Sequence, residues 1–289
     1  MFNNKNITIF GGTGSIGSLI AEKLLSEFDA SQITLFSNNE NELWESRNKF
    51  GIGPVAFDNI NLMFGDIRDK TAVKNAVKDA DYVFNCAALK HIGFCEQSPV
   101  DAVLTNVLGL QNIIDACNKY KVKLMVHIST DKAVNPSSVM GATKLIGERM
   151  CRDEGCKKAI IRLGNVMGSR GSLLPQLREY LKQERKCVYI TSPKMKRYFI
   201  TPNLLSEFIM KICHQPHYNQ ASIYIPKMVE YEIMDVVNEY LNKKGLKNTE
   251  IVVFGAGDAE KFTEALYTQS EANVIQEFDD MYIIEGIPT

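Results

Sequence analysis

The feature that most limits the possible folds is a glycine-rich segment close to the start of the chain. Gly11, Gly14 and Gly17 follow an apolar run at residues 7–10 and open an amphipathic stretch at 16–28. Glycine permits a tight turn between a strand and a helix and lets another molecule approach the backbone closely. The first helical turn adds free N–H groups and a dipole that favours an anion. The segment therefore predicts a βα unit that binds the pyrophosphate of a dinucleotide.

The same alternation continues through the first 165 residues. Apolar, β-branched runs predict strands at residues 7–10, 33–36, 61–64, 82–86, 124–128 and 159–163. Amphipathic stretches between them predict helices at residues 16–28, 40–50, 71–78, 107–120 and 139–153. Apolar strands separated by helices form parallel sheets that are covered on both faces. We therefore predict an α/β fold, a Rossmann-type doubly wound parallel sheet.

The pattern changes after residue 163. A Gly/Ser-rich loop at 164–172 precedes predicted helices at 173–184, 203–213 and 231–242 and short strands near 189–192 and 197–201. We expect a Rossmann domain at 1–165 and a smaller C-terminal substrate-binding lobe at 166–289, with segments that return to the Rossmann domain. Ligands of doubly wound sheets bind at the carboxyl ends of the strands, so we expect the lobe to cap the site.

Charge and composition argue against several classes of partner. The 289-residue chain has a net charge of −1, which predicts binding neither to nucleic acid nor to anionic lipid. Apolar runs stay well short of the roughly 20 residues that span a bilayer. Because the first predicted strand begins almost at Met1, we expect a cytoplasmic protein without a leader or membrane segment. Seven scattered cysteines are typical of reduced thiols. Cys213, His214 and His217 lack a second ligand group at suitable spacing, so no metal site is expected.

The spacing Gly-x-x-Gly-x-x-Gly is that of short-chain dehydrogenase/reductase proteins and predicts a nicotinamide cofactor. The second strand ends at Ser37-Asn38-Asn39, where a carboxylate would hold the ribose 2′-hydroxyl of NAD and repel the phosphate of NADP. After this strand end no carboxylate occurs before Glu40, and its absence from the strand end favours NADP over NAD, which remains the alternative. Arg47 and Lys49 are the candidate partners of the NADP phosphate. The predicted cofactor contacts are Gly11, Thr13, Gly14, Ser15, Ile16, Gly17, Ser37, Asn38, Asp66, Ile67, Ala87, Ala88, Lys90 and Lys144.

The strand at 124–128 leads into a segment with catalytic potential. Short-chain dehydrogenases carry a Ser/Thr there, followed by Tyr-x-x-x-Lys, which places tyrosine and lysine one turn apart on a helix. Thr130 and Lys144 match the Ser/Thr and the lysine. Met140 stands at the tyrosine position and cannot transfer a proton.

Over nearly its whole length the sequence resembles the UDP-N-acetylglucosamine 4,6-dehydratase family of extended short-chain dehydrogenases. The matching segments are 87–91, Glu96 with Pro99, 105–106, 129–133, 162–172 and 195–201. The Asp131-Lys132 pair together with the Gly-Ser-Arg-Gly-Ser loop at 168–172 is highly specific to this family, and the chain resembles its Met-type members. Two motifs depart from the family pattern. The C-terminal Arg-Pro-Gly-Glu-Lys-x-x-Glu motif lacks its arginine and proline at 255–264, and Ser-Arg-Asp has become Ser37-Asn38-Asn39.

The resemblance implies a dehydration that needs no external reductant. C4 of the sugar is oxidised by hydride transfer to the cofactor, water leaves across C5 and C6, and the hydride returns to C6. Asp131 is then the acid and Lys132 the base. Reprotonation of C5 from the opposite face would invert that centre. The acceptor of the C4 hydroxyl proton stays open between Thr130, which can hydrogen-bond the hydroxyl, and Asp131 acting through the substrate or a water.

The implied substrate is a UDP-N-acetylhexosamine. Lys90 and His91 follow the fourth strand and are expected to face the nicotinamide or the sugar, while His91 could equally be structural. Arg170 and Arg197 are the predicted diphosphate partners, because guanidinium groups match phosphate geometry. The predicted substrate contacts are Lys90, His91, Met140, Asn165, Arg170, Arg197 and Glu260.

Two other functions remain open from the sequence. One is a nucleotide-sugar epimerase or reductase on the same fold, against which the Asp131-Lys132 pair argues. The other is a non-catalytic NAD(P)-binding sensor, which Met140 and the altered C-terminal motif favour. Relatives of this kind are often dimers or larger assemblies, so we expect a homo-oligomer.

Overall fold

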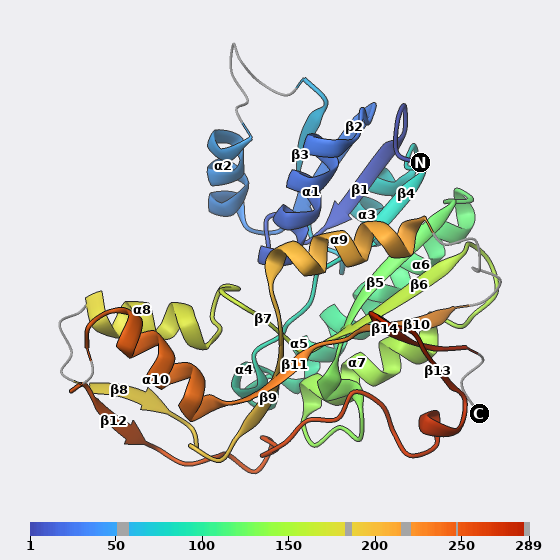
Figure 1. Ribbon diagram of the computed structural model, residues 1–289. Coiled ribbons are helices and arrows are strands. Elements are labelled where there is room, and N and C mark those ends of the chain that lie inside the picture. The colour runs from blue at the N-terminus through green and yellow to red at the C-terminus, as the bar shows by residue number, and fades with distance from the viewer. Residues whose placement is uncertain (51–57, 183–186, 215–220, 247, 286–289) are drawn as a thin grey trace.

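The computed structural model describes residues 1–50, 58–182, 187–214, 221–246 and 248–285 (Figure 1). His217 and the last two residues of the predicted helix at 173–184 lie outside these ranges. A nine-stranded sheet dominates the fold. In spatial order its strands are β13 (Ile275–Glu277), β14 (Met281–Ile284), β10 (Ser222–Pro226), β6 (Lys158–Leu163), β5 (Leu124–Thr130), β4 (Tyr82–Asn85), β1 (Asn6–Phe10), β2 (Gln32–Ser37) and β3 (Ile60–Phe64).

The strand order and direction are those of a doubly wound fold. The seven strands from β3 to β10 are parallel to their neighbours, in the order 3-2-1-4-5-6 followed by β10. This confirms the predicted α/β Rossmann-type class. The sheet differs from the prediction at one edge, where β14 pairs antiparallel with both β10 and β13.

Helices cover both faces of this sheet (Figure 1). On one face, α1 (Ser15–Glu27) packs beside α9 (Pro202–Cys213), and on the other α3 (Lys70–Val77) packs beside α6 (Leu110–Lys119). The side chains of each strand alternate between two cores. Ile7 and Ile9 of β1 belong to the first, and Phe10 to the second.

Further helices and turns connect the strands of the large sheet. They are the helices α2 (Glu40–Lys49), α4 (Ile92–Gln97), α5 (Pro99–Val103) and α7 (Val139–Met150), the π-helical turn η1 (Leu104–Gly109) and the 3₁₀ turns η2 (Asp131–Ala133) and η3 (Glu271–Asn273). Side-chain caps set two of the helix starts beside the site. The side chain of Asn39 accepts from Glu42 N at the start of α2, and that of Ser138 accepts from Gly141 N in α7.

The smaller lobe lies to one side of the sheet, at the lower left of Figure 1. It contains α8 (Leu173–Lys182), α10 (Ile233–Lys243), the pair β8 (Cys187–Ile190) and β12 (Glu250–Val253), and a sheet of β7 (Asn165–Val166), β9 (Lys196–Ile200) and β11 (Val229–Glu232). A core of Leu177, Val188, Ile190, Val237 and Leu241 holds the first four of these together. The chain returns to the large sheet twice, through α9 and β10 between β9 and β11, and through β13 and β14 after β12.

A buried ion-pair network ties the returning C-terminal segment to the sheet. Arg162 on β6 donates to both carboxylate oxygens of Glu148 in α7 and of Glu271 in η3, at 2.7–3.0 Å. Burial acts to raise the pKa of Glu271, but the hydrogen bonds and charge of Arg162, together with hydrogen bonds from Thr268, outweigh it and hold that pKa below its ordinary value. No helix within the described ranges has both the length and the apolar character that crossing a bilayer requires.

Candidate functional site

A cleft of about 920 Å³ opens at the carboxyl ends of the parallel strands. Its walls come from the glycine loop, from the loops after β2, β3, β4, β5 and β6, and from α7, as expected for a doubly wound sheet. The predicted residues that line it are Gly11, Thr13, Gly14, Ser15, Ile16, Gly17, Ser37, Asn38, Asp66, Ile67, Ala87, Ala88, Lys90, His91, Thr130, Lys132, Met140, Lys144, Asn165 and Arg170. Asp131, Arg197 and Glu260 do not belong to this lining.

The glycine loop fits the pyrophosphate of a dinucleotide. Gly11 has a φ of +69°, and a Cβ at this position would lie 2.8 Å from Ala87 N, so the two loops meet backbone to backbone. A side chain on Gly17 would overlap the carbonyl oxygen of Gly11. The loop thus presents bare backbone and the first turn of α1 to the cleft, which is the arrangement that a phosphate group requires.

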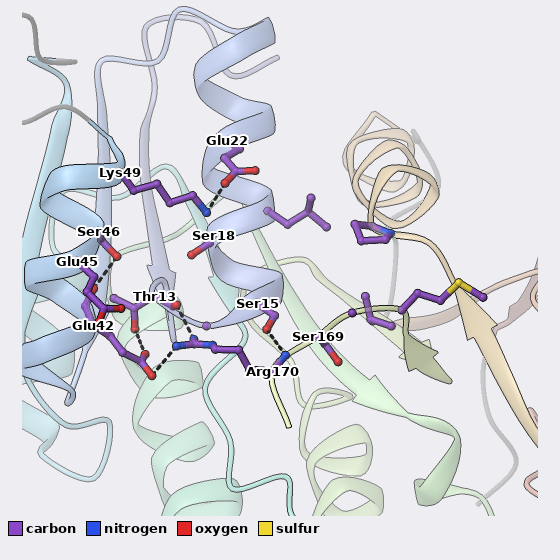
Figure 2. A pocket seen from close by; sticks show the side chains of 16 residues that line it. Thr13, Ser15, Ser18, Glu22, Glu42, Glu45, Ser46, Lys49, Ser169 and Arg170 are labelled. Atoms are coloured by element: carbon purple, nitrogen blue, oxygen red, sulfur yellow. Dashed lines mark hydrogen bonds and ion pairs between the residues drawn. The ribbon is translucent and has the colours of Figure 1, made fainter. Parts of the chain in front are cut away.

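A network of polar side chains joins the glycine loop to α2 (Figure 2). The Thr13 hydroxyl lies 2.9 Å from Ser37 Oγ and 2.7 Å from Glu42 Oε2. Arg170 reaches the same cluster: its Nη1 lies 2.6 Å from Glu42 Oε1, and its Nη2 donates to Thr13 O at 2.6 Å. Next to this cluster, a second hollow of about 430 Å³ lies between α1, α2 and the loop at 166–170. Arg170, predicted to bind the substrate diphosphate, therefore lies at the glycine loop with both ends of its guanidinium engaged.

The acid–base pair predicted from the sequence lies at the end of β5. Asp131 is fully buried; its Oδ1 accepts from Thr130 Oγ1 at 2.9 Å and lies 3.0 Å from Lys132 Nζ. Its Oδ2 is also buried and has no hydrogen-bond partner among the described residues. Thr130 and Lys132 face the cleft, with Asp131 directly behind them. Asp131 thus adjoins a hydroxyl and an amine that both reach the cleft wall.

Glu264 joins this pair from the C-terminal segment. Its Oε1 lies 3.7 Å from Lys132 Nζ, and its Oε2 lies 3.2 Å from Lys261 Nζ, which donates to Val134 O at 2.7 Å. Lys132 is thus held between two buried carboxylates. The sequence-based selection named Glu260 instead, but Glu260 accepts from Gly257 N within its own turn. The Glu-Lys-x-x-Glu spacing at 260–264, which ends at Glu264, could have identified Glu264 from the sequence.

Lys144 and Met140 lie one turn apart on α7, as their spacing predicts. Lys144 is enclosed by protein, and its Nζ donates to Ile128 O at 2.8 Å. Burial lowers the pKa of Lys144 to about 8. Met140 is 3% exposed and packs with Cys95 and Ala102, with its remaining surface towards the cleft. An apolar side chain therefore occupies the place where a proton-transferring tyrosine would stand.

Lys90 and His91 line the cleft from the loop between β4 and α4. Lys90 Nζ donates to Arg170 O at 2.6 Å, which links the loop after β4 to the Gly/Ser-rich loop. Burial lowers the pKa of Lys90, and the charge of Arg170 lowers it further. Burial also lowers the pKa of His91, in the same direction as the neighbouring charge of Lys90. Asn165, in β7, also lines the cleft.

Arg197 does not lie where the sequence-based interpretation placed it. Its Nη1 donates to Lys196 O at 2.7 Å and to Phe262 O at 3.1 Å, and its Nη2 donates to Lys261 O at 2.8 Å. These carbonyls engage the guanidinium inside the lobe, away from the cleft lining, so its predicted contact with a diphosphate has no support. Arg197 instead fixes the segment that carries Lys261 and Glu264.

The chain has relatives of similar length among known proteins. A family model described as "Polysaccharide biosynthesis protein" matches residues 7–286. An uncharacterized membrane protein of Methanocaldococcus jannaschii is 37% identical, over 98% of this chain and 86% of that protein. A UDP-N-acetylglucosamine 4,6-dehydratase (inverting) of Campylobacter jejuni is 31% identical, over 98% of this chain and 84% of its own.

Relatives with a second activity occur as well. A UDP-glucose 4-epimerase of Rickettsia canadensis is 32% identical, over 98% of this chain and 84% of its own length. Among solved structures, the X-ray structure of Pen from Bacillus thuringiensis has a TM-score of 0.92 and 33% identity, and the match covers 98% of this chain and 90% of that one. The fold is that of extended short-chain dehydrogenases, and the named relatives include enzymes that act on UDP-sugars. Because the family model matches nearly the whole chain, the chain belongs to the polysaccharide biosynthesis protein family.

Proposed function

We propose that this chain is a nucleotide-sugar 4,6-dehydratase that converts a UDP-N-acetylhexosamine to a 4-keto-6-deoxy product. The observation that carries the proposal is the group formed by Thr130, Asp131 and Lys132 at the cleft wall, with Lys132 Nζ 3.0 Å from Asp131 and 3.7 Å from Glu264. Loss of water across C5 and C6 needs a base for the C5 proton and an acid for the departing hydroxyl. A lysine and a carboxyl group side by side meet that need.

The proposal includes a nicotinamide dinucleotide. The glycine loop would hold its pyrophosphate, Asp66 and Ile67 would flank its adenine, and Lys144 would bind the nicotinamide ribose. When bound, such a cofactor accepts a hydride from C4 and returns one to C6, so the overall reaction is the loss of one water molecule. The buried Lys144 ammonium, which donates to Ile128 O, is positioned for a ribose hydroxyl at the floor of the cleft.

Each residue of the acid–base group has a separate role in this proposal. Lys132 takes the proton from C5 and later returns one, and return to the opposite face inverts C5. Asp131, which is buried behind Thr130, takes the C4 hydroxyl proton through the Thr130 hydroxyl and later supplies a proton by the same route to the C6 hydroxyl, which leaves as water. Thr130 orients the C4 hydroxyl. Lys90, His91 and Asn165, which also line the cleft, are the proposed contacts of the sugar and its acyl or phosphate groups.

The main competitor is a C4 epimerase, the activity named for the Rickettsia relative. A simple epimerase of this fold moves the C4 hydroxyl proton through the tyrosine whose place Met140 takes here. Met140 has no ionisable atom and is almost fully buried. A non-catalytic sensor would have no use for Lys132 between two carboxylates at the cleft wall. Both observations favour the dehydratase.

Incubation with UDP-N-acetylglucosamine in deuterated water, followed by NMR, tests the proposal. We expect a 4-keto-6-deoxy product with deuterium at C5, and nuclear Overhauser effects between the C6 methyl group and the ring protons report the configuration at C5. An epimerase would produce the C4 epimer with all ring protons retained. Absence of turnover with every UDP-hexosamine tried, in a protein that still binds the dinucleotide, would overturn the enzyme claim.

Matched variants assign the roles. Asp131→Asn and Lys132→Ala should abolish product and leave dinucleotide binding unchanged. Asp81 and Lys123 form a comparable pair, 2.6 Å apart, at the amino end of the same sheet. Asp81→Asn and Lys123→Ala should therefore retain activity. If both Asp131→Asn and Lys132→Ala stay active, the role assignment is wrong.

A further inference from the structure

We propose that Glu42 makes this chain select NAD over NADP. The inference rests on the dinucleotide site of the proposed function, but not on its sugar chemistry. Doubly wound domains that use NAD commonly hold the adenosine ribose 2′-hydroxyl with a carboxylate near the end of the second strand. In this sequence β2 ends at Ser37, and the absence of a carboxylate there favoured NADP.

The fold supplies a carboxylate from α2. Glu42 lies in the first turn of α2, and its Oε2 is 2.7 Å from the Thr13 hydroxyl, which itself lies 2.9 Å from Ser37 Oγ. Figure 2 shows Glu42 turned from α2 towards Thr13. The Glu42 side chain is 28% exposed and lines the cleft, so it can accept a hydrogen bond from a ligand. It therefore replaces the missing carboxylate at the end of β2.

A 2′-phosphate would find the nearby cations already paired. Arg170 bridges Glu42 and Thr13 O. Lys49, a candidate phosphate partner from the sequence, points across the smaller hollow to Glu22 on α1 (Figure 2). Arg47, the other candidate, lies over the ring of Trp44, with its Cζ 5.3 Å from the ring centroid.

On the adenine side of the cleft, the nearby cation is likewise already paired with a carboxylate. Arg68 forms two hydrogen bonds to Asp66 Oδ2, at 3.0 and 2.7 Å, and this interaction lowers the pKa of Asp66. Asn38, at the end of β2, lies within 3.4 Å of the same oxygen. A phosphate bearing two negative charges would thus meet two carboxylates whose countercharges are already engaged, which opposes its binding.

Trp44 allows a direct binding test, because it is the only tryptophan in the chain and lies two residues from Glu42. Energy transfer from Trp44 to bound NADH or NADPH reports dissociation constants without any turnover. We expect the wild type to bind NADH at least about tenfold more tightly than NADPH. Glu42→Gln, which keeps the contact to Thr13 and removes the charge, should narrow this ratio to about threefold or less.

Glu45→Gln is the matched control, since Glu45 lies one turn further along α2 beside the smaller hollow and outside the cleft lining. It should leave the ratio unchanged. Equal or tighter binding of NADPH by the wild type overturns the inference, and so does an unchanged ratio in Glu42→Gln. The wild-type comparison decides on its own if that variant does not fold.

The outcome is separable from that of the proposed function. A protein that prefers NADH but dehydrates no UDP-hexosamine contradicts the proposed function and supports the role of Glu42. A protein that dehydrates the sugar and prefers NADPH supports the proposed function and contradicts the role of Glu42. Mass analysis of any dinucleotide released on denaturing the purified protein gives a second readout, with NAD expected and NADP contradicting the inference.

Discussion

The amine of Lys132 lies 3.7 Å from the carboxylate of Glu264, although the two residues come from opposite halves of the chain. The contact exists because Lys261 donates to Val134 O and Arg197 holds the carbonyls of residues 261 and 262. The C-terminal segment is thereby fixed against η2. We infer that it positions Lys132 for the reaction without touching the sugar.

Removal of the Glu264 charge tests this positioning role. Glu264→Gln should lower kcat about tenfold with little change in KM or in dinucleotide affinity, since it loosens Lys132 without altering the cleft wall. Steady-state kinetics and the binding assay measure both effects. Glu260→Gln is the matched control and should behave like the wild type. An unchanged kcat in Glu264→Gln would show that Lys132 needs no second carboxylate.

Activity should fall on the alkaline side as Lys144 loses its proton. Burial lowers the pKa of Lys144 to about 8, so the charged form predominates below that pH and disappears above it. A profile of kcat/KM against pH should therefore decline through about 8. Lys144→Arg keeps its charge over this range and, if active at all, should lose that decline. Persistence of the same alkaline limb in an active Lys144→Arg would assign it to another group.

The same burial predicts that Lys144 lowers stability. Its folded pKa is about 8 and its ordinary value is 10.5, so the unfolded chain binds more protons between these values. The cost of burying the charge is then complete below pH 8 and is relieved as the pH rises towards 10.5. Lys144→Met should raise the free energy of unfolding at pH 7 by about 1–3 kcal/mol and by less at pH 10. Thermal or urea unfolding at both values checks this, and destabilisation at pH 7 would contradict it.

The buried network around Arg162 should dominate the docking of the C-terminal segment. Arg162→Met leaves Glu148 and Glu271 buried without their partner and should cost about 3–5 kcal/mol of unfolding free energy. Lys211→Met, which removes an exposed pair with Asp280, should cost about 0–1 kcal/mol. Urea unfolding distinguishes the two. Similar losses in both variants would mean that the network contributes no more than a surface ion pair.

Much of the large sheet was predictable from the sequence because its central strands are buried on both faces. Largely apolar runs such as 33–36 and 159–163 alternate with amphipathic helices, and this pattern has few alternative folds. The short helices α4 and α5 span too few residues to show a helical period. β13 and β14 have mixed burial and lie at the sheet edge, so neither their existence nor their direction was readable from the pattern.

The candidate site was predictable where it is local in sequence. Gly11, Thr130 and Lys144 lie on elements whose spacing sets their positions, and all three line the cleft. Glu42 and Glu264 join the site only through tertiary packing. Arg197 shows the opposite case: a guanidinium suited to phosphate is engaged instead by backbone carbonyls of a distant segment. Spacing along one element cannot reveal which distant segment will satisfy a side chain.

The fate of the hydrogen at C4 tests the central claim most directly. UDP-N-acetylglucosamine that carries deuterium at C4 should be incubated in ordinary water and its product examined by NMR and mass spectrometry. The dehydratase account predicts that the deuterium moves to the new C6 methyl group. Deuterium that stays at C4 of an epimerised UDP-sugar would contradict the account.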